Sequence, residues 1–256
     1  MKIILTFVFF LAQLVFSQSS TEWITYFESS GFTSTPNYQE TMDYFQKLAN
    51  YSLHAELKIF GVSPQGRELK CLVVSKDNLF EPDQYSNRNK PVLLMINGIH
   101  SGEIEGKDAS MLLLRDILVT KEKENLLDSL ILLVIPIFNV DGHERTSKYN
   151  RINQNGPEEM GWRTTAQNLN LNRDWMKAAA PEMQAMLKLI VDWMPDFIID
   201  SHTTDGADYQ YTITYAVEKY QNIYPETAYW LNESFVPFLE YGVEKRGFLI
   251  YQYIYL

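Results

Sequence analysis

The chain has 256 residues, of which 46% are hydrophobic, 14% aromatic and 21% charged, and its formal net charge is −10 at pH 7. Length and composition are typical of a globular protein with one sizeable core. The acidic balance argues against nucleic acids and anionic membranes as partners. Cys71 is the only cysteine, so an intrachain disulfide bond is excluded.

Residues 1–17 differ from the rest of the chain. Lys2 precedes an apolar run over residues 3–16, and the small residues Val15 and Ser17 precede the expected cleavage point. This pattern predicts a secretory signal peptide, and the run is short for a membrane anchor, which is the alternative. No cysteine follows the run, so a lipid anchor is not expected. We therefore expect a secreted or periplasmic protein without stable membrane insertion.

The remaining chain shows alternating helical and strand patterns. In chain order we expect helices over residues 22–32 and 38–51, a hairpin of strands over 55–60 and 68–75, a strand over 92–96, a helix over 103–114, a strand over 130–135, a helix over 178–193 and strands over 196–200 and 248–256. This order predicts an α/β fold with one domain over residues 18–256. Its sheet should be mixed, mostly parallel and twisted, with helices on both faces.

The strand over 92–96 ends at Asn97 and Gly98, and His100 and Glu103 follow before the next helix. A corner between a strand and a helix exposes side chains on a rigid support. An imidazole nitrogen and a carboxylate three residues apart can bind one metal ion from the same turn, and zinc accepts both. The pair therefore predicts a metal site that needs a third ligand.

The other histidines are the candidates for that ligand. His54 lies between a helix and a strand, which favours a structural or surface role, and His143 follows a turn glycine among charged residues, which favours a solvated loop position. His202 instead follows an apolar strand and should project at its carboxyl end, where open α/β sheets gather their sites. His100, Glu103 and His202 then make a His₂Glu set with a fourth position for water, the pattern of catalytic zinc.

Arg163, Asn172 and Arg173 lie in irregular segments between residues 143 and 175. A long loop inside a compact domain is usually functional or disordered. An arginine with an adjacent asparagine can hold a carboxylate through forked, charge-assisted hydrogen bonds. A second arginine near a metal can stabilise the oxyanion of a tetrahedral intermediate. Each arginine alone is an ordinary solvated residue, but together with the metal set they favour a substrate site.

Five motifs between residues 41 and 213 carry a family resemblance: GVSPQGREL, NGIHSGEIEG, IPIFNVDGHE, GWRTTAQNLNLNRDW and IIDSHTTDG. In this order they resemble the zinc carboxypeptidases, the metallocarboxypeptidases of peptidase family M14 related to pancreatic carboxypeptidase A. The resemblance implies the zinc carboxypeptidase fold, one zinc ion, and hydrolysis of the C-terminal bond of peptides with a free terminal carboxylate.

The resemblance also implies residue roles. His100, Glu103 and His202 match the three zinc ligands. Arg163 matches the arginine that polarises the scissile carbonyl, and the Asn172–Arg173 pair matches the residues that bind the terminal carboxylate. Arg67, in the GVSPQGREL turn, resembles an arginine that lines an outer part of the substrate groove.

Two features depart from the family pattern. Many members carry an aspartate two residues before the Asn–Arg pair, where it orients the first zinc-binding histidine. Here that residue is Asn170, which can accept the hydrogen bond without bringing charge, and Asp200 is a candidate to supply charge beside His202. The family's general-base glutamate comes on a late strand, and none of the later glutamates fits that role: Glu218, Glu226, Glu233, Glu240 and Glu244.

We therefore expect a C-terminally truncated sequence with an incomplete and inactive catalytic domain. A naturally shortened, inactive homologue is the alternative. Other functions also stay open: an amide hydrolase of the same fold acting on N-acyl amino acids or cell-wall peptides, a serine hydrolase using Ser101, or a secreted peptide-binding protein without catalysis. The GIHSG string departs from a nucleophile elbow, which disfavours the serine hydrolase.

Overall fold

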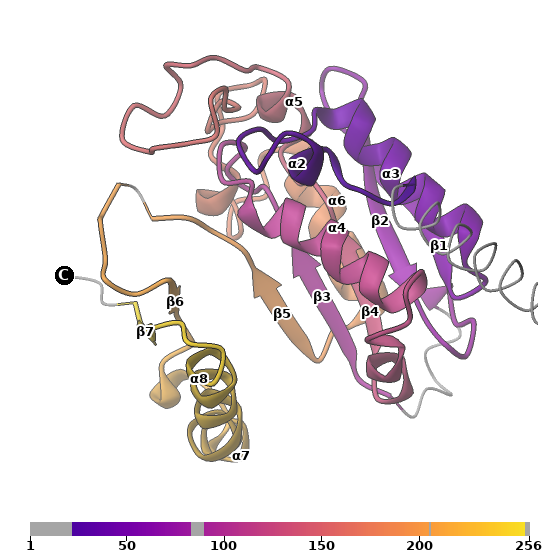
Figure 1. Cartoon of the computed structure of the whole chain (residues 1–256), viewed down its shortest axis with the longest axis vertical. Helices are drawn as coiled ribbons and strands as arrows, with labels where there is room; N and C mark the ends of the chain where they lie inside the picture. Colours follow the sequence, from indigo (N-terminus) through magenta and orange to yellow (C-terminus); the bar gives the residue numbers. More distant parts are fainter. Residues whose placement is uncertain (1–21, 83–89, 205, 254–256) are drawn as a thin grey trace, which may run out of the picture. The chain divides into compact units, whose positions relative to one another are not determined.

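The computed structural model describes residues 22–82, 90–204 and 206–253. They divide into two compact units, one up to residue 204 and one from residue 206 onward (Figure 1). The predicted signal peptide lies outside the described residues. Among the described residues, no helix combines the length and apolar character needed to cross a membrane.

The first unit is built on a five-stranded sheet with the order β1-β2-β4-β3-β5 (Figure 1). Its strands are β1 (Ala55–Val62), β2 (Glu68–Val74), β3 (Val92–Ile96), β4 (Ile131–Ile135) and β5 (Phe197–Asp200). The pairs β1–β2 and β2–β4 are antiparallel, whereas β3 runs parallel to both β4 and β5. The predicted mixed α/β sheet is confirmed, and half of its four pairings are parallel.

Helices cover both faces of this sheet, as its apolar strands require. Val92, Leu94 and Ile96 of β3 pack in a cluster with α6 (Pro181–Trp193). The alternate residues of β3 face a second cluster, which contains side chains from α3 (Tyr38–Tyr51) and α4 (Glu105–Leu118). The period of two along a strand explains this division of one buried strand between two cores.

The strands expected over residues 55–60, 68–75, 92–96, 130–135 and 196–200 and the helix over 38–51 match the structure closely. Of the strand expected over 248–256, only Ile250–Gln252 is a strand, and residues 254–256 lie outside the described residues. Other helix ends also differ. The helix expected over 22–32 is reduced to α2 (Tyr26–Ser29), because Thr25 caps its start and Gly31 and Phe32 adopt positive φ angles just after it. The helix α6 begins at Pro181 instead of residue 178. Asp174 accepts hydrogen bonds from the backbone nitrogens of residues 179 and 180, so the preceding segment forms a turn.

The segment after β4 buries a histidine that we expected to be solvated. Asn139 caps a short helix, α5 (Val140–His143), by accepting a hydrogen bond from the Gly142 nitrogen at 3.0 Å. All residues of α5 are buried, and the His143 side chain is 5% exposed. The expectation for His143 was wrong because the turn winds into a helix and carries the ring inward, against Glu144.

The second unit combines helices with a small sheet. Its two strands, β6 (Ile213–Tyr215) and β7 (Ile250–Gln252), pair in parallel. Between them lie η4 (Tyr220–Asn222), α7 (Pro225–Trp230), the π-helical turn η5 (Leu231–Phe235) and α8 (Val236–Glu244). The Tyr215 hydroxyl donates to Glu240 Oε1 at 2.6 Å, which links the sheet to α8.

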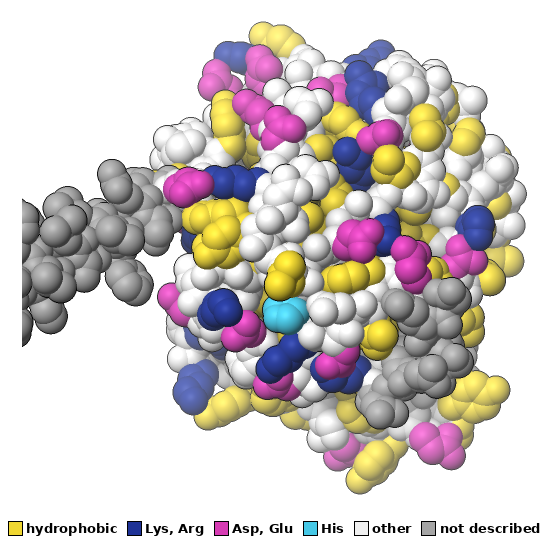
Figure 2. All heavy atoms as spheres, turned by 90° about the vertical axis from the view of Figure 1, so that its right-hand side faces the viewer, with side chains coloured by type: hydrophobic (Ala, Val, Ile, Leu, Met, Phe, Trp, Pro, Cys, Tyr) yellow, Lys and Arg dark blue, Asp and Glu magenta, His cyan; other side chains and the backbone are white. Residues whose placement is uncertain are grey.

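Charges of both signs are interspersed on the face of the molecule in Figure 2. Exposed ion pairs include Lys47 with Glu22 and Lys148 with Glu158. Such exposed pairs contribute about 0–1 kcal/mol each. They therefore add little to the stability of the fold.

Candidate metal centre

Two neighbouring parallel strands end side by side and carry the candidate ligands. Ile96 of β3 is the register partner of Asp200 of β5. Beyond these residues the Ser201 hydroxyl donates to Asn97 Oδ1 at 2.7 Å, and the Ser201 nitrogen donates to the Ile96 oxygen at 3.0 Å. His202, the next residue, therefore leaves the sheet at the same edge as the chain that follows β3.

A tight turn brings His100 and Glu103 to this edge. Gly98 adopts a φ of +64°, a conformation that favours glycine, directly after β3. The Glu103 nitrogen then donates to the His100 oxygen at 2.9 Å and closes the turn. The helix α4 starts two residues later and approaches Ser201 closely, because a Cβ atom on Gly106 would lie 1.9 Å from Ser201 Oγ.

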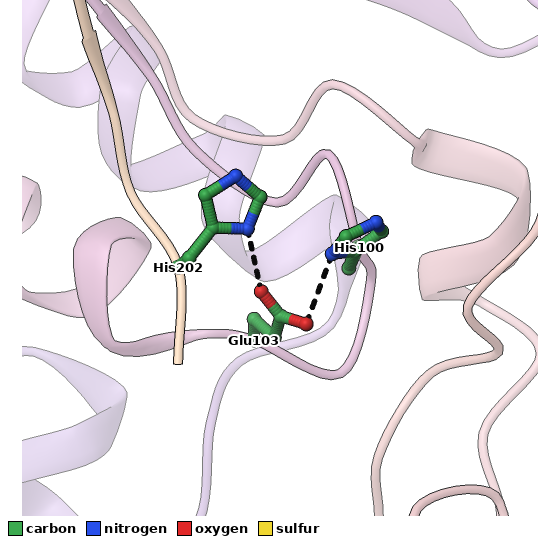
Figure 3. Close-up of side chains that lie close together, drawn as sticks. All are labelled: His100, Glu103 and His202. Carbon is green, nitrogen blue, oxygen red and sulfur yellow. Dashed lines mark hydrogen bonds and ion pairs between the residues drawn. The ribbon is translucent and has the colours of Figure 1, made fainter. Parts of the chain in front are cut away.

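The two imidazole rings meet at one carboxylate (Figure 3). His100 Nδ1 lies 3.0 Å from Glu103 Oε1, and His202 Nδ1 lies 2.8 Å from Glu103 Oε2. The ligand atoms of the three residues all lie within 4.8 Å of one another, and within the described chain no other group of three such side chains could hold a metal. The structure thus brings together the three residues that the sequence singled out.

The electrostatics of the three side chains depend on each other. Burial alone would raise the pKa of Glu103, but hydrogen bonds from His100 and His202, together with the Arg151 guanidinium, hold that pKa well below its usual range. Burial would lower the pKa of His202, but the carboxylates of Asp200 and Glu103 raise it to about 9. The centre therefore keeps an ionised carboxylate between two nitrogen donors.

Each histidine is also held from its far side. Asn170 Oδ1 lies 3.3 Å from His100 Nε2, and Asp200 Oδ2 lies 3.1 Å from His202 Nε2. Both partners occupy the positions that the sequence analysis anticipated for them. Metal-binding histidines usually have such a partner on the second ring nitrogen, where it fixes the ring's orientation and tautomer.

The donor set fits zinc. Two imidazole nitrogens and one carboxylate oxygen that converge from rigid strand ends leave a fourth tetrahedral position for water or substrate, as in catalytic zinc sites. The acidic partners Glu103 and Asp200 also suit a divalent cation. Ser101, in contrast, is buried and its hydroxyl donates to the Asn139 oxygen at 3.0 Å, an unsuitable position for a nucleophile.

Residues 41–236 match the family model of the zinc carboxypeptidases, peptidase family M14. The chain belongs to this family. Comparison with curated proteins gave no match. Among solved structures, a metallo-carboxypeptidase from Burkholderia cenocepacia is 17% identical, with a TM-score of 0.62 over 85% of this chain and 53% of its own length. The carboxypeptidase A from Helicoverpa armigera is 18% identical, with a TM-score of 0.62 over 86% of this chain and 58% of its own.

These similarities establish the zinc carboxypeptidase fold. The chain spans 53% and 58% of the length of these two proteins. It spans 41% and 40% of two others, from Shewanella denitrificans and Burkholderia mallei.

The arginine expected to polarise the substrate carbonyl lies beside the candidate metal centre. Arg163 Nη1 is 3.3 Å from Glu103 Oε1, and its side chain is 30% exposed. Arg67 pairs with the buried Asp141 at 2.7 Å. It borders a cavity of about 340 Å³ that residues 164–166 also line, directly after Arg163. The segment that follows Arg163 thus lines a cavity that Arg67 also borders.

The predicted carboxylate-binding pair lies in the short helix η3 (Leu171–Arg173), next to the centre. Asn170 links η3 to the centre. Its Oδ1 accepts a hydrogen bond from the Asn172 nitrogen at 3.0 Å and also contacts His100. Arg173 is exposed, with Nη1 donating to the Asn172 oxygen at 2.8 Å. Its guanidinium is therefore accessible to a ligand.

Sequence analysis missed two residues that shape the centre. Arg151 is 4% exposed, and its Nη2 donates to Glu103 Oε1 at 2.9 Å. Asn97 is buried and uses Nδ2 to donate to Ser110 Oγ and the Ile135 oxygen, both at 3.0 Å. Arg151 lies in the loop without periodicity, so the unusual length of that loop was the available signal. The sequence indicates Asn97 only as part of a turn.

Proposed function

We propose that this zinc carboxypeptidase-family chain binds one zinc ion through His100, Glu103 and His202 and recognises peptides by a free C-terminal carboxylate. The proposed reaction of the whole protein is hydrolysis of the C-terminal peptide bond. The observation that carries the proposal is the convergence of both imidazole Nδ1 atoms on one buried carboxylate. Family membership supports the choice of zinc.

A zinc ion in this set supplies a bound water of near-neutral pKa and polarisation of the carbonyl. The chain's own residues would do the rest. Arg163, partly exposed beside Glu103, would stabilise the oxyanion that develops on the carbonyl oxygen. Asn172 and Arg173 would fix the substrate through charge-assisted hydrogen bonds to its terminal carboxylate.

The reaction also needs a group that accepts the proton of the attacking water. Among residues 22–82 and 90–204, the carboxylates in hydrogen-bond contact with His100 and His202 are Glu103 and Asp200. One is the proposed ligand and the other supports a ligand. We therefore propose that residues 1–256 bind zinc and substrate but turn over substrate slowly or not at all.

Export is the second part of the proposal. The pattern of residues 1–17 supports a signal peptide, and the exported protein would begin at Gln18. Mass spectrometry of protein recovered from the medium or periplasm of expressing cells tests this. A protein retained with residues 1–17 intact would contradict it.

Binding of paired peptides tests the substrate class directly. The zinc-loaded chain is titrated with a tripeptide that ends in a free acid and with the same tripeptide ending in an amide. We expect preference for the free acid. Arg173→Ala should weaken free-acid binding about 10- to 150-fold, the loss expected for a hydrogen bond between charged groups. Binding of the amide should not change.

Lys177→Ala is the matched control, since it removes an exposed cation four residues further along the chain. It should leave both affinities unchanged. Equal losses for the acid and the amide in Arg173→Ala would contradict the assigned role. A preference for N-acyl amino acids or muropeptides over simple peptides would redirect the proposal to an amide hydrolase of the same fold.

A further inference from the structure

We propose that Arg151 is a positioning residue for Glu103, and that the loop over residues 147–160 belongs to the metal centre. The inference rests on the proposed zinc site, and it assigns a role to a segment without regular structure. The loop is closed at its base by the backbone bridge between Ser147 and Met160. Asn150 strengthens the closure because its Nδ2 donates to the oxygens of Arg145 and Met160, at 2.6 and 2.9 Å.

Arg151 turns inward from this closed loop. Its side chain is 4% exposed, and Nη2 donates to Glu103 Oε1 at 2.9 Å. Lys148, on the same loop, shows the ordinary alternative: its side chain is 54% exposed and pairs with Glu158 on the surface. Burial of a guanidinium is costly unless a paired, hydrogen-bonded anion compensates it. The pairing with Glu103 therefore contributes to the compensation for burying Arg151.

The backbone next to Glu103 is shaped to let this arginine pass. A Cβ atom on Gly102 would lie 2.8 Å from Arg151 Cγ and 3.4 Å from the Gly161 oxygen. Real Cβ atoms essentially never lie as close as 2.8 Å to another atom, so a side chain at residue 102 would require the stem of Arg151 to move. The glycine that precedes Glu103 thus provides the path by which Arg151 reaches the carboxylate.

The same loop also holds the other side of the centre. Gln154 Nε2 donates to Thr203 Oγ1 at 3.1 Å and to the Thr204 oxygen at 3.0 Å, directly after His202. The Gln154 nitrogen donates to the Arg151 oxygen at 2.9 Å, so the two side chains leave one turn. One loop therefore contacts both the Glu103 carboxylate and the segment that carries His202.

The two arginines near Glu103 differ in a way that separates their roles. Arg163 contacts Oε1 at the longer distance of 3.3 Å and is 30% exposed, so it can meet a substrate. Arg151 is buried and lies at 2.9 Å, so its position suits an action on the carboxylate more than on a substrate. A charge-assisted hydrogen bond from the buried guanidinium to Glu103 Oε1 restricts the rotation of that carboxylate. Arg151 would thereby hold Glu103 in its metal-binding orientation.

Zinc affinity tests the proposal by competition with a chromophoric chelator, on the full chain and on three variants. Arg151→Ala should bind zinc about 10- to 100-fold more weakly, as for loss of other partners of metal ligands. Arg151→Lys should recover part of the loss, because it keeps a cationic donor on a shorter side chain. Lys148→Ala removes an exposed cation from the same loop and should match the unmodified chain.

A Co²⁺-loaded form supplies a second readout. The visible ligand-field bands of Co²⁺ should shift in Arg151→Ala and stay unchanged in Lys148→Ala, because the geometry of Glu103 changes only in the former. Should Arg151→Ala not fold, Arg151→Lys carries the comparison, with a smaller loss of affinity and a smaller band shift expected.

Zinc affinity of Arg151→Ala within twofold of the unmodified chain, or tighter, would overturn the inference. Tighter binding would mean that the guanidinium acts only by repelling the cation. Failure of the proposed function gives a different result, since the unmodified chain itself would then not bind zinc.

Discussion

Asn170 Oδ1 lies 3.3 Å from His100 Nε2, and the same oxygen accepts a hydrogen bond from the Asn172 nitrogen. One neutral amide therefore connects a proposed zinc ligand to the proposed carboxylate-binding turn. In the family pattern an aspartate is expected at this position. Here the orientation of His100 depends on a group without charge.

Asn170→Ala should affect both parts of the centre. We expect zinc affinity to fall about tenfold because His100 loses the partner that orients its ring. Free-acid peptide affinity should fall as well, because η3 loses its cap. Competition with a chelator and peptide titration measure the two effects. Gln167→Ala, an exposed amide from the same segment, is the control. Loss of only one affinity would show that the two sites are not connected through Asn170.

Asp200→Asn should weaken zinc binding through His202. Asp200 Oδ2 lies 3.1 Å from His202 Nε2, and its charge strengthens the ring as a ligand. We expect a loss of about 10- to 100-fold in zinc affinity. Asp196→Asn is not a suitable control because Asp196 Oδ2 accepts from the Val92 nitrogen. Asp192→Asn, on the exposed end of α6, is suitable. Unchanged zinc affinity and metal content in Asp200→Asn would contradict the proposed support of His202 by Asp200.

The strands β3, β4 and β5 were predictable because each is a short apolar run near turn residues. The three-residue strand β6 was not predicted. The parallel neighbours β3 and β5 then placed His100, Glu103 and His202 at one sheet edge. The short length of α2 within the helix expected over 22–32 was not predictable, because it depends on local geometry. Thr25 caps the start of the helix, and Gly31 adopts a positive φ angle just after its end.

Long-range contacts explain what the sequence did not reveal about the site. Arg151 contacts Glu103 across 48 positions, from a loop without any period. The burial of His143 depends on how α5 packs, which no local pattern encodes. A charged or polar residue in an irregular segment looks solvated until its partner is known.

His143 should make stability depend on pH. Burial lowers the pKa of His143, whereas the bond to Glu144 opposes this effect. The unfolded chain, with an ordinary pKa near 6.5, therefore binds more protons than the folded chain below that pH. Stability should be fully present above about pH 6.5 and fall as the pH drops towards the folded-state pKa.

Urea unfolding of the full chain between pH 5 and 7.5 measures this dependence. In His143→Phe, the fall in unfolding free energy with decreasing pH should be smaller, because the ring no longer titrates. His54→Phe is the control, since His54 lies outside α5. A steeper pH dependence in His143→Phe would contradict the assignment.

Gly106→Ala should disturb the approach of α4 to β5. The new Cβ atom would lie 1.9 Å from Ser201 Oγ and 2.5 Å from Asn97 Oδ1. Overpacking of this kind costs about 1–3 kcal/mol or more, despite the better helix propensity of alanine. Gly242→Ala, in α8, meets no atom closer than 3.9 Å and should not destabilise the chain. Thermal unfolding compares the two, and equal stability would contradict the predicted clash.

Zinc stoichiometry tests the central claim most directly. The full chain and single variants are dialysed against zinc at neutral pH, and bound metal is measured by atomic absorption. We predict one zinc ion per chain, retained in His54→Ala and lost in His100→Ala, Glu103→Ala and His202→Ala. A chain that binds no zinc, or a Glu103→Ala variant that retains a full equivalent, would contradict the account.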